Sequence, residues 1–176
     1  MNIKPTQEYD HKRKLEHDIH FTIDQNGSWY FHGGNTPGPM HREALVKLFA
    51  DKALKFKDGK YFLATPFESY EVNVEDVPFM IVDFEETEQG EIKLFTNISD
   101  EITLNKERKI FLKAPAFTDI ELPYIEVREG LNARLSQRVR DAFIEKALEQ
   151  NNDLEEGDIL FFNLNDVMHP IAKWDE

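Results

Sequence analysis

Short runs of alternating apolar and polar residues, separated by turn sequences, restrict the fold of this chain more than any other feature. Segment 19–23 places an apolar residue at every second position, and segment 29–31 resumes the alternation after Asn26-Gly27. A period of two is typical of a strand with one buried face, and Asn-Gly supplies the positive φ angles of a tight hairpin turn. The pattern therefore predicts a β-hairpin over 19–31. Further strands are predicted near residues 56–63 (a second hairpin), 70–74, 79–84, 92–95, 102–104, 109–112, 124–127 and 159–164.

Two segments change from the two-residue repeat to helical spacing. Residues 41–54 follow a loop rich in glycine and proline, and Pro39 suits the first turn of a helix because its missing N–H would lack a partner there anyway. Residues 131–148 follow Gly130 and place apolar side chains at steps of three to five, the strongest helical signal in the chain. We predict one amphipathic helix in each segment.

The order of these elements indicates an internal repeat. Each half runs strand, strand, helix, turn and apolar strand, with Asp58-Gly59 as the turn in the first half and Glu156-Gly157 in the second. The alternative is that acidic residue–glycine turns simply precede many strands. The repeat predicts two similar subdomains, residues 19–78 and 79–176, each built of strands with one main helix. A flexible extension, residues 1–18, precedes them.

Charge and composition exclude several classes of function. The chain of 176 residues carries 34 acidic and 21 basic side chains, so its net charge of −13 argues against nucleic acid and anionic membranes as partners and favours a basic protein or peptide. Without cysteine it has no disulfide and no thiolate metal site. No apolar stretch is long enough for a signal peptide or a membrane span, so a cytoplasmic location is expected.

Two groups of side chains in the first half are candidates for ligand binding. Main-chain N–H groups of the glycine-rich loop, with Arg42 beside them, could hold a carboxylate or phosphate, although an ordinary connecting loop is the favoured interpretation. Glu75 and Asp76 end a predicted strand. Adjacent side chains of a strand point to opposite faces, so they make a poor acid–base pair, and a turn cap plus an ion pair with an arginine is favoured.

A third candidate site lies where a predicted strand leads into the second helix. Arg128, Asn132 and Arg134 cluster there, and arginine recognises carboxylates and phosphates through two parallel hydrogen bonds. Thr96 and Asn97 are possible neighbours. In so acidic a chain, a structural salt bridge to Glu75, Asp76 or Glu129 is the default interpretation of these arginines. We regard this junction as the best candidate for a functional surface.

No motif indicates catalysis, a metal or a cofactor. The six histidines are expected at surfaces and turns, and none of the four serines lies in a G-x-S-x-G sequence. The preferred hypothesis is a non-enzymatic binding or regulatory module that takes a basic protein segment in a groove or at a sheet edge. The alternative is a hydrolase-type enzyme for small molecules, with Glu75, Asp76 and His41 in a cleft between the subdomains. A third possibility is a homo-oligomer joined through edge strands.

Six segments in chain order resemble a bacterial family of proteins known as domain of unknown function 1285. They are residues 24–29 (DQNGSW), 45–49 (LVKLF), 59–66 (GKYFLATP), 74–79 (VEDVPF), 95–97 (FTN) and 123–134 (PYIEVREGLNAR). The resemblance covers about residues 19 to 165. It implies an α+β fold of two similar subdomains, each a curved antiparallel half-barrel of strands with one main helix, similar to part of a pleckstrin-homology barrel. It also implies a role in signal transduction. The family has no assigned catalytic residues, so none is transferred to this chain.

Overall fold

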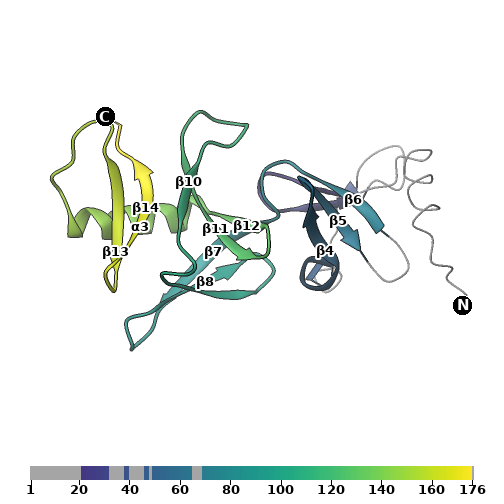
Figure 1. Cartoon of the computed structure of the whole chain (residues 1–176), viewed down its shortest axis with the longest axis horizontal. Helices are drawn as coiled ribbons and strands as arrows, with labels where there is room; N and C mark the ends of the chain where they lie inside the picture. Colours follow the sequence, from purple (N-terminus) through teal and green to yellow (C-terminus); the bar gives the residue numbers. More distant parts are fainter. Residues whose placement is uncertain (1–20, 32–37, 40–45, 48, 65–68, 176) are drawn as a thin grey trace, which may run out of the picture. The chain divides into compact units, whose positions relative to one another are not determined.

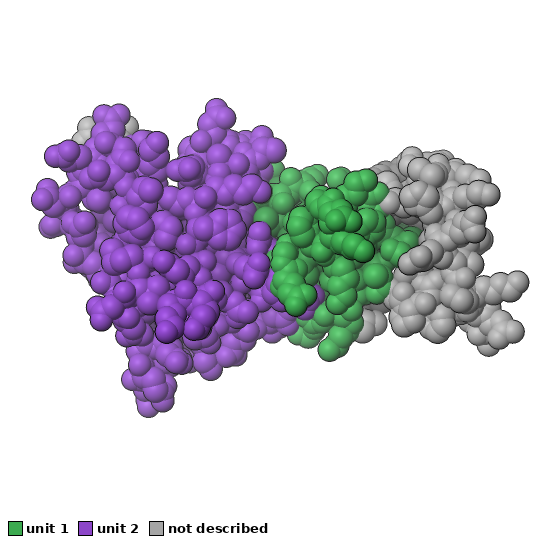
Figure 2. Space-filling view, in the orientation of Figure 1, with its two compact units in different colours: residues 1–78, 129–131 green, residues 79–128, 132–176 purple. Residues whose placement is uncertain are grey.

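The computed structural model describes residues 21–31, 38–39, 46–47, 49–64 and 69–175 (Figure 1). The chain divides into two compact units, coloured separately in Figure 2. Unit 1 comprises residues 1–78 and 129–131, and unit 2 comprises residues 79–128 and 132–176. None of the helices in the described ranges is long and apolar enough to cross a membrane.

Unit 1 contains a six-stranded sheet with the order β3-β2-β1-β6-β5-β4. Its first hairpin is confirmed: β1 and β2 are antiparallel, and Gly27 has a φ of 82° in the turn between them. The Asp24 carboxylate accepts the main-chain N–H groups of Asn26 and Ser28, each at 2.9 Å, which closes this turn. The strands are β1 (Phe21–Ile23), β2 (Trp29–Phe31), β3 (Gly38–Pro39), β4 (Leu54–Lys57), β5 (Lys60–Ala64) and β6 (Ser69–Val74).

Aromatic rings form much of the core of unit 1. The ring of Phe21 packs edge-on against Trp29 at 6.4 Å and against Phe49 at 5.6 Å between centroids. Phe49 begins a short π-helical turn, η1 (Phe49–Ala53), and Leu54 already belongs to strand β4. The predicted helix over residues 41–54 lies partly outside the described residues, and its predicted end is one residue too far because the chain turns directly into the β4–β5 hairpin.

Unit 2 contains a second six-stranded sheet, with the order β10-β11-β12-β7-β8-β9, which curls into a half-barrel (Figure 1). The α+β fold with two sheet-dominated subdomains is therefore confirmed. The likeness of each sheet to part of a pleckstrin-homology barrel stays a prediction. The strands are β7 (Phe79–Glu86), β8 (Ile92–Thr96), β9 (Glu101–Leu104), β10 (Phe111–Lys113), β11 (Leu122–Arg128) and β12 (Leu131–Leu135).

The two sheets share one topology, but the internal repeat differs from the predicted one in the position of its helices. In each sheet two three-stranded antiparallel sets meet through a parallel contact between the first and the last strand, β1 with β6 and β7 with β12. The prediction that the two helices occupy equivalent positions in the repeat is wrong. Helix α3 (Gln137–Gln150) follows the sixth strand of the second sheet, whereas η1 precedes the fourth strand of the first sheet. Asp58-Gly59 and Glu156-Gly157 are therefore not equivalent turns.

The predicted helix over residues 131–148 begins too early. Gly130, with a φ of 70°, turns the chain into β12, where Leu131, Ala133 and Leu135 are buried at alternate positions. The helix starts only after Ser136, whose Oγ accepts the Val139 N–H at 3.4 Å as an N-cap. The spacing of the apolar residues in this segment suits a strand as well as a helix, and the pairing of β12 with β7 selects the strand.

The chain ends in a hairpin of β13 (Ile159–Leu164) and β14 (Val167–Lys173), of which only β13 was predicted. Asn165 and Asp166 form its two-residue turn, with φ values of 51° and 65°. On the helix side, the Phe143 ring packs edge-on against the Phe162 ring, with their centroids 5.3 Å apart. This contact places β13 against α3.

Candidate functional site

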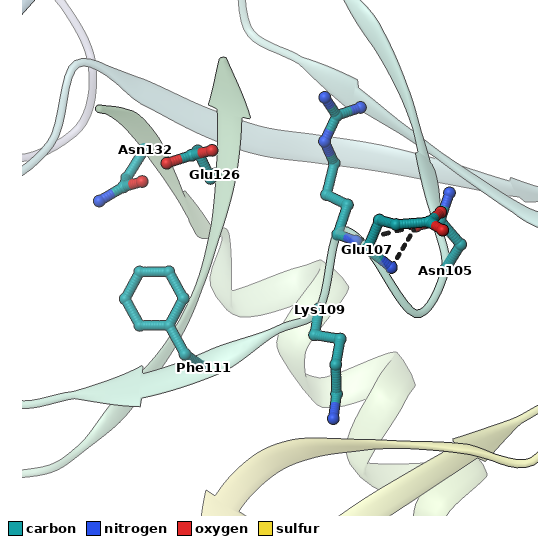
Figure 3. Close-up of a pocket in the computed structure, with 7 residues that line it drawn as sticks. Asn105, Glu107, Lys109, Phe111, Glu126 and Asn132 are labelled. Atoms are coloured by element: carbon teal, nitrogen blue, oxygen red, sulfur yellow. Dashed lines mark hydrogen bonds between the residues drawn. The ribbon is translucent and has the colours of Figure 1, made fainter. Parts of the chain in front are cut away.

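Unit 2 contains an open cavity of about 540 Å³ beside strand β10, which we call the β10 cavity (Figure 3). In Figure 3, Phe111, Glu126 and Asn132 lie on one side of this cavity and Asn105 and Glu107 on the other. The walls come from the β9–β10 connection and from strands β10, β11 and β12. The lining residues are Asn105, Glu107, Arg108, Lys109, Phe111, Glu126 and Asn132.

A closed turn presents the two basic side chains of the cavity. The carboxamide oxygen of Asn105 accepts the main-chain N–H groups of Glu107 at 3.0 Å and of Arg108 at 2.8 Å, drawn as dashed lines in Figure 3. The Asn105 N–H also donates to the Arg108 carbonyl at 3.3 Å. An asparagine that bonds the backbone two and three residues ahead fixes a turn locally. The positions from which Arg108 and Lys109 extend are therefore set by residues of the same loop.

Phe111 forms a partly exposed aromatic wall. Its ring stacks on the ring of Tyr124, with 5.8 Å between centroids and 21° between planes. Tyr124 is fully buried, whereas Phe111 is 36% exposed. The buried tyrosine therefore holds the phenylalanine in place and leaves its outer face available for contact.

A buried histidine supports the base of the β9–β10 connection. The main-chain N–H of Ile110 donates to Nδ1 of His169 at 3.3 Å, and His169 has no solvent-exposed area. Burial, together with the charge of Lys109, lowers the pKa of His169 to about 4. The expectation that all six histidines lie at surfaces or turns is wrong for His169, because the hydrogen bond and the apolar surroundings retain a neutral imidazole in the core.

The charges of the β10 cavity are balanced. Arg108 and Lys109 are basic, Glu107 and Glu126 are acidic, and Asn105 and Asn132 supply carboxamides. None of these lining side chains is a serine, threonine, histidine or cysteine that could act as a nucleophile. The arrangement suits recognition of a ligand that carries both signs of charge and has an apolar part for Phe111.

Asn132 is the predicted site residue that lines the β10 cavity, whereas Arg128 and Arg134 occupy other positions. The guanidinium group of Arg128 lies over the Phe79 ring at 5.6 Å, and that of Arg134 lies over the Phe117 ring at 4.8 Å. Arg134 is 8% exposed. Both cations therefore stack on aromatic faces, a favourable interaction that orients the guanidinium plane.

Asn97 holds the backbone of strand β7. Its Oδ1 accepts the Met80 N–H at 3.1 Å, and its own N–H donates to the Met80 carbonyl at 2.9 Å. These bonds lie next to the register irregularity between Ile81 and Asp83. The contacts of Asn97 are thus those of a residue that positions a strand.

The predicted residues of the first half lie in unit 1. The Glu75 carboxylate accepts the Gln25 N–H at 3.0 Å in an open cavity of about 610 Å³, lined by Thr22, Asp24, Gln25, Asn26, Tyr30, Asn73 and Glu75. The Tyr30 hydroxyl donates to Asp24 at 3.0 Å, and this bond raises the pKa of the tyrosine.

Asp76 does not line the cavity that contains Glu75. Its charge helps to raise the pKa of Tyr61, for which burial is the main cause. Arg42 lies outside the described residues.

Sequence reasoning missed most of the β10 cavity. It predicted strands near residues 102–104 and 109–112 but gave no reason to join the segment between them with Phe111 and Glu126. The signal that could have pointed to this cavity is a pair of adjacent cations, Arg108 and Lys109, in a strongly acidic chain. Within the described ranges, no three histidine, aspartate or glutamate side chains are grouped closely enough to hold a metal ion.

Comparison with known proteins agrees with this architecture. Residues 5–77 match the N-terminal domain model of the domain of unknown function DUF1285, and residues 78–169 match its C-terminal domain model. A crystal structure of a DUF1285 family protein from Silicibacter pomeroyi DSS-3 has 25% sequence identity and a TM-score of 0.72, and the match covers 88% of this chain and 80% of that one. A DUF1285 family protein from Shewanella baltica OS155 has 29% identity and a TM-score of 0.54, with coverage of 72% and 91%. No curated protein matches the chain. Since the two domain models together span nearly the whole sequence, the chain belongs to the DUF1285 family.

Proposed function

We propose that this protein is a non-enzymatic binding module that recognises a segment of another protein in the β10 cavity. The observation that carries the proposal is the lining of that cavity, in which charged and carboxamide side chains from three elements surround a buttressed, partly exposed aromatic ring. Binding sites for peptides combine an aromatic or apolar contact with a few fixed polar groups in this way.

The lining indicates what such a segment carries. An acidic side chain or a terminal carboxylate would meet Arg108 and Lys109, a basic side chain would meet Glu126, and a main-chain amide suits the carboxamide of Asn132. The net charge of −13 favours approach of a partner that is basic overall. A regulatory role in signal transduction and a cytoplasmic location belong to the same proposal.

The alternative, a hydrolase-type enzyme that uses carboxylates, has less support. Glu75 already binds the Gln25 amide, and the acidic residue that shares its cavity is Asp24 instead of Asp76. His41 lies outside the described residues. The contacts around Glu75 are those of a turn between strands, so recognition is the better-supported function.

A selection from a random peptide library tests the proposal. The purified full chain would be immobilised and challenged at low and at moderate salt, and the enriched peptides would be synthesised and titrated against the protein. We expect Arg108→Ala and Glu126→Ala each to weaken binding by about tenfold or more, because each removes a charge-assisted contact. The matched control is Arg138→Ala, since Arg138 lies outside the cavity lining and pairs with Asp83.

Two results would overturn the proposal. The first is that no peptide is enriched at either salt concentration. The second is that enriched peptides bind the Arg108→Ala and Glu126→Ala variants as tightly as the unchanged protein, which would place recognition outside the β10 cavity.

A further inference from the structure

Strand β13 has a free edge and an apolar outer face. It pairs with β14 on one side and with no other strand in the described part of the chain. Leu160 and Phe162 are buried on the side of α3, whereas Ile159 is 42% exposed and Phe161 is 37% exposed. An edge with exposed apolar side chains is a template for another strand.

One position of this edge is already occupied by a side chain. The carboxamide of Gln150, the last residue of α3, accepts the Asn163 N–H at 2.7 Å and donates to the Asn163 carbonyl at 2.8 Å. It thereby bonds both main-chain groups of Asn163 as a neighbouring strand would. Alternate residues of a strand direct their main-chain groups to the same side, so Phe161 directs its N–H and C=O to that edge as well. No charge or proline protects β13 between Ile159 and Leu164.

Negative charge flanks the edge at both ends. Before β13 lie the exposed Asp153, Glu155, Glu156 and Asp158, and residues 149–158 contain no lysine or arginine. At the other end, Asn163 and Leu164 help to line an open cavity of about 290 Å³ that also contains Glu86, Glu91, Glu149 and Lys146. Since Lys146 is paired with Glu86, the remaining charge of this cavity is negative.

We propose that the edge of β13 binds an extended segment of a partner protein that has apolar residues at alternate positions and basic residues at both ends. The segment adds to the sheet through main-chain hydrogen bonds, lays its apolar side chains beside Ile159 and Phe161, and places its basic ends against the acidic loop and the acidic cavity. A second copy of this chain is a poorer occupant, because it would bring the same acidic flank to the interface. The site is separate from the β10 cavity, so either proposal can fail alone.

A synthetic probe makes this testable on the full chain. The probe is a short peptide of alternating valine and threonine with two lysines at each end, titrated by fluorescence anisotropy. We expect binding that weakens at high salt, and a loss of about tenfold or more when the lysines are replaced by glutamates. N-methylation of alternate amides of the peptide should cause a similar loss, because it removes the donors to β13 and leaves the protein unchanged.

Variants of the protein locate the contact. Phe161→Lys adds a charge to the exposed face and should weaken binding about tenfold, whereas Ile120→Lys, at another exposed apolar position of unit 2, should not. Arg108→Ala should leave binding of this probe intact, which separates this test from that of the β10 cavity. Three results would each overturn the proposal. The first is that the probe does not bind, and the second is that the N-methylated peptide binds as tightly as the unmodified one. The third is that the protein forms a dimer that Phe161→Lys dissociates, while the probe does not bind.

Discussion

His169 Nδ1 accepts the main-chain N–H of Ile110 at 3.3 Å inside unit 2. The bond joins strand β14 to the residue that directly precedes β10. In a neutral imidazole one nitrogen accepts and the other carries the proton, so this geometry places the proton on Nε2. The histidine is therefore held in its uncharged form by its contact as well as by burial.

We expect His169 to make the stability of the protein depend on acidity. Its folded pKa of about 4 lies below the ordinary histidine pKa of 6.5, so between these values the unfolded chain takes up a proton before the folded chain does. Stability is lost as pH falls through this window, by up to about 3 kcal/mol at pH 4. Urea unfolding at several pH values would show this, and His169→Gln should have a shallower pH dependence. Equal slopes for the two proteins would contradict the assignment.

Gly130 and Gly90 form a matched pair for substitution by alanine. Both have positive φ, 70° and 77°, so each replacement should cost about 1–2 kcal/mol of backbone strain. A Cβ on Gly130 would lie 2.7 Å from Cδ1 of Phe56, whereas one on Gly90 would meet nothing within 4 Å. Gly130→Ala should therefore destabilise the protein by about 1–3 kcal/mol more than Gly90→Ala. Thermal unfolding measures the difference, and Phe56→Ala should reduce it. Equal losses would show that Phe56 moves aside without cost.

Phe143 should contribute far more to stability than Phe161. Phe143 has no exposed area and packs against Phe84 at 5.1 Å and Phe162 at 5.3 Å, so Phe143→Ala should cost about 3–5 kcal/mol. Phe161 is partly exposed, and Phe161→Ala should cost under about 1 kcal/mol. Chemical denaturation of both variants provides the measurement. A large loss for Phe161→Ala would mean that its ring is covered in solution.

Ser136 should stabilise α3 through its cap. Removal of its hydroxyl in Ser136→Ala leaves the Val139 N–H without its acceptor and should cost about 1 kcal/mol. Ser136→Asp retains an acceptor at this position and should restore most of the stability. Circular dichroism during thermal unfolding can compare the three proteins, and an aspartate variant no more stable than the alanine variant would argue against the cap.

Local patterns were sufficient to predict most strands and the α+β class, but they did not distinguish every strand from a helix. Leu131, Leu135 and Val139 are four residues apart, which suits one face of a helix. The same segment also alternates, and the parallel register that places Ala133 opposite Phe79 selects the strand. That pairing joins residues more than fifty positions apart, so no local window contains it.

Strand β14 and the β10 cavity were missed for a related reason. His169 and Pro170 interrupt the alternation of β14, although Asn165-Asp166 was a recognisable hairpin turn. In the cavity, Asn132 could be named from its setting near two arginines, but its partnership with Arg108, Phe111 and Glu126 depends on how β10, β11 and β12 lie in the sheet.

The sequence by itself determined where the chain extends and turns, that its sheets bury apolar faces, and that its surface is strongly acidic. These properties depend on neighbouring residues or on sums over the chain. Only the tertiary structure decided which strand pairs with which, which histidine is buried, and which polar side chains share a cavity. Such choices depend on contacts between distant segments, whose free energy exceeds the weak local preference for one backbone conformation over another.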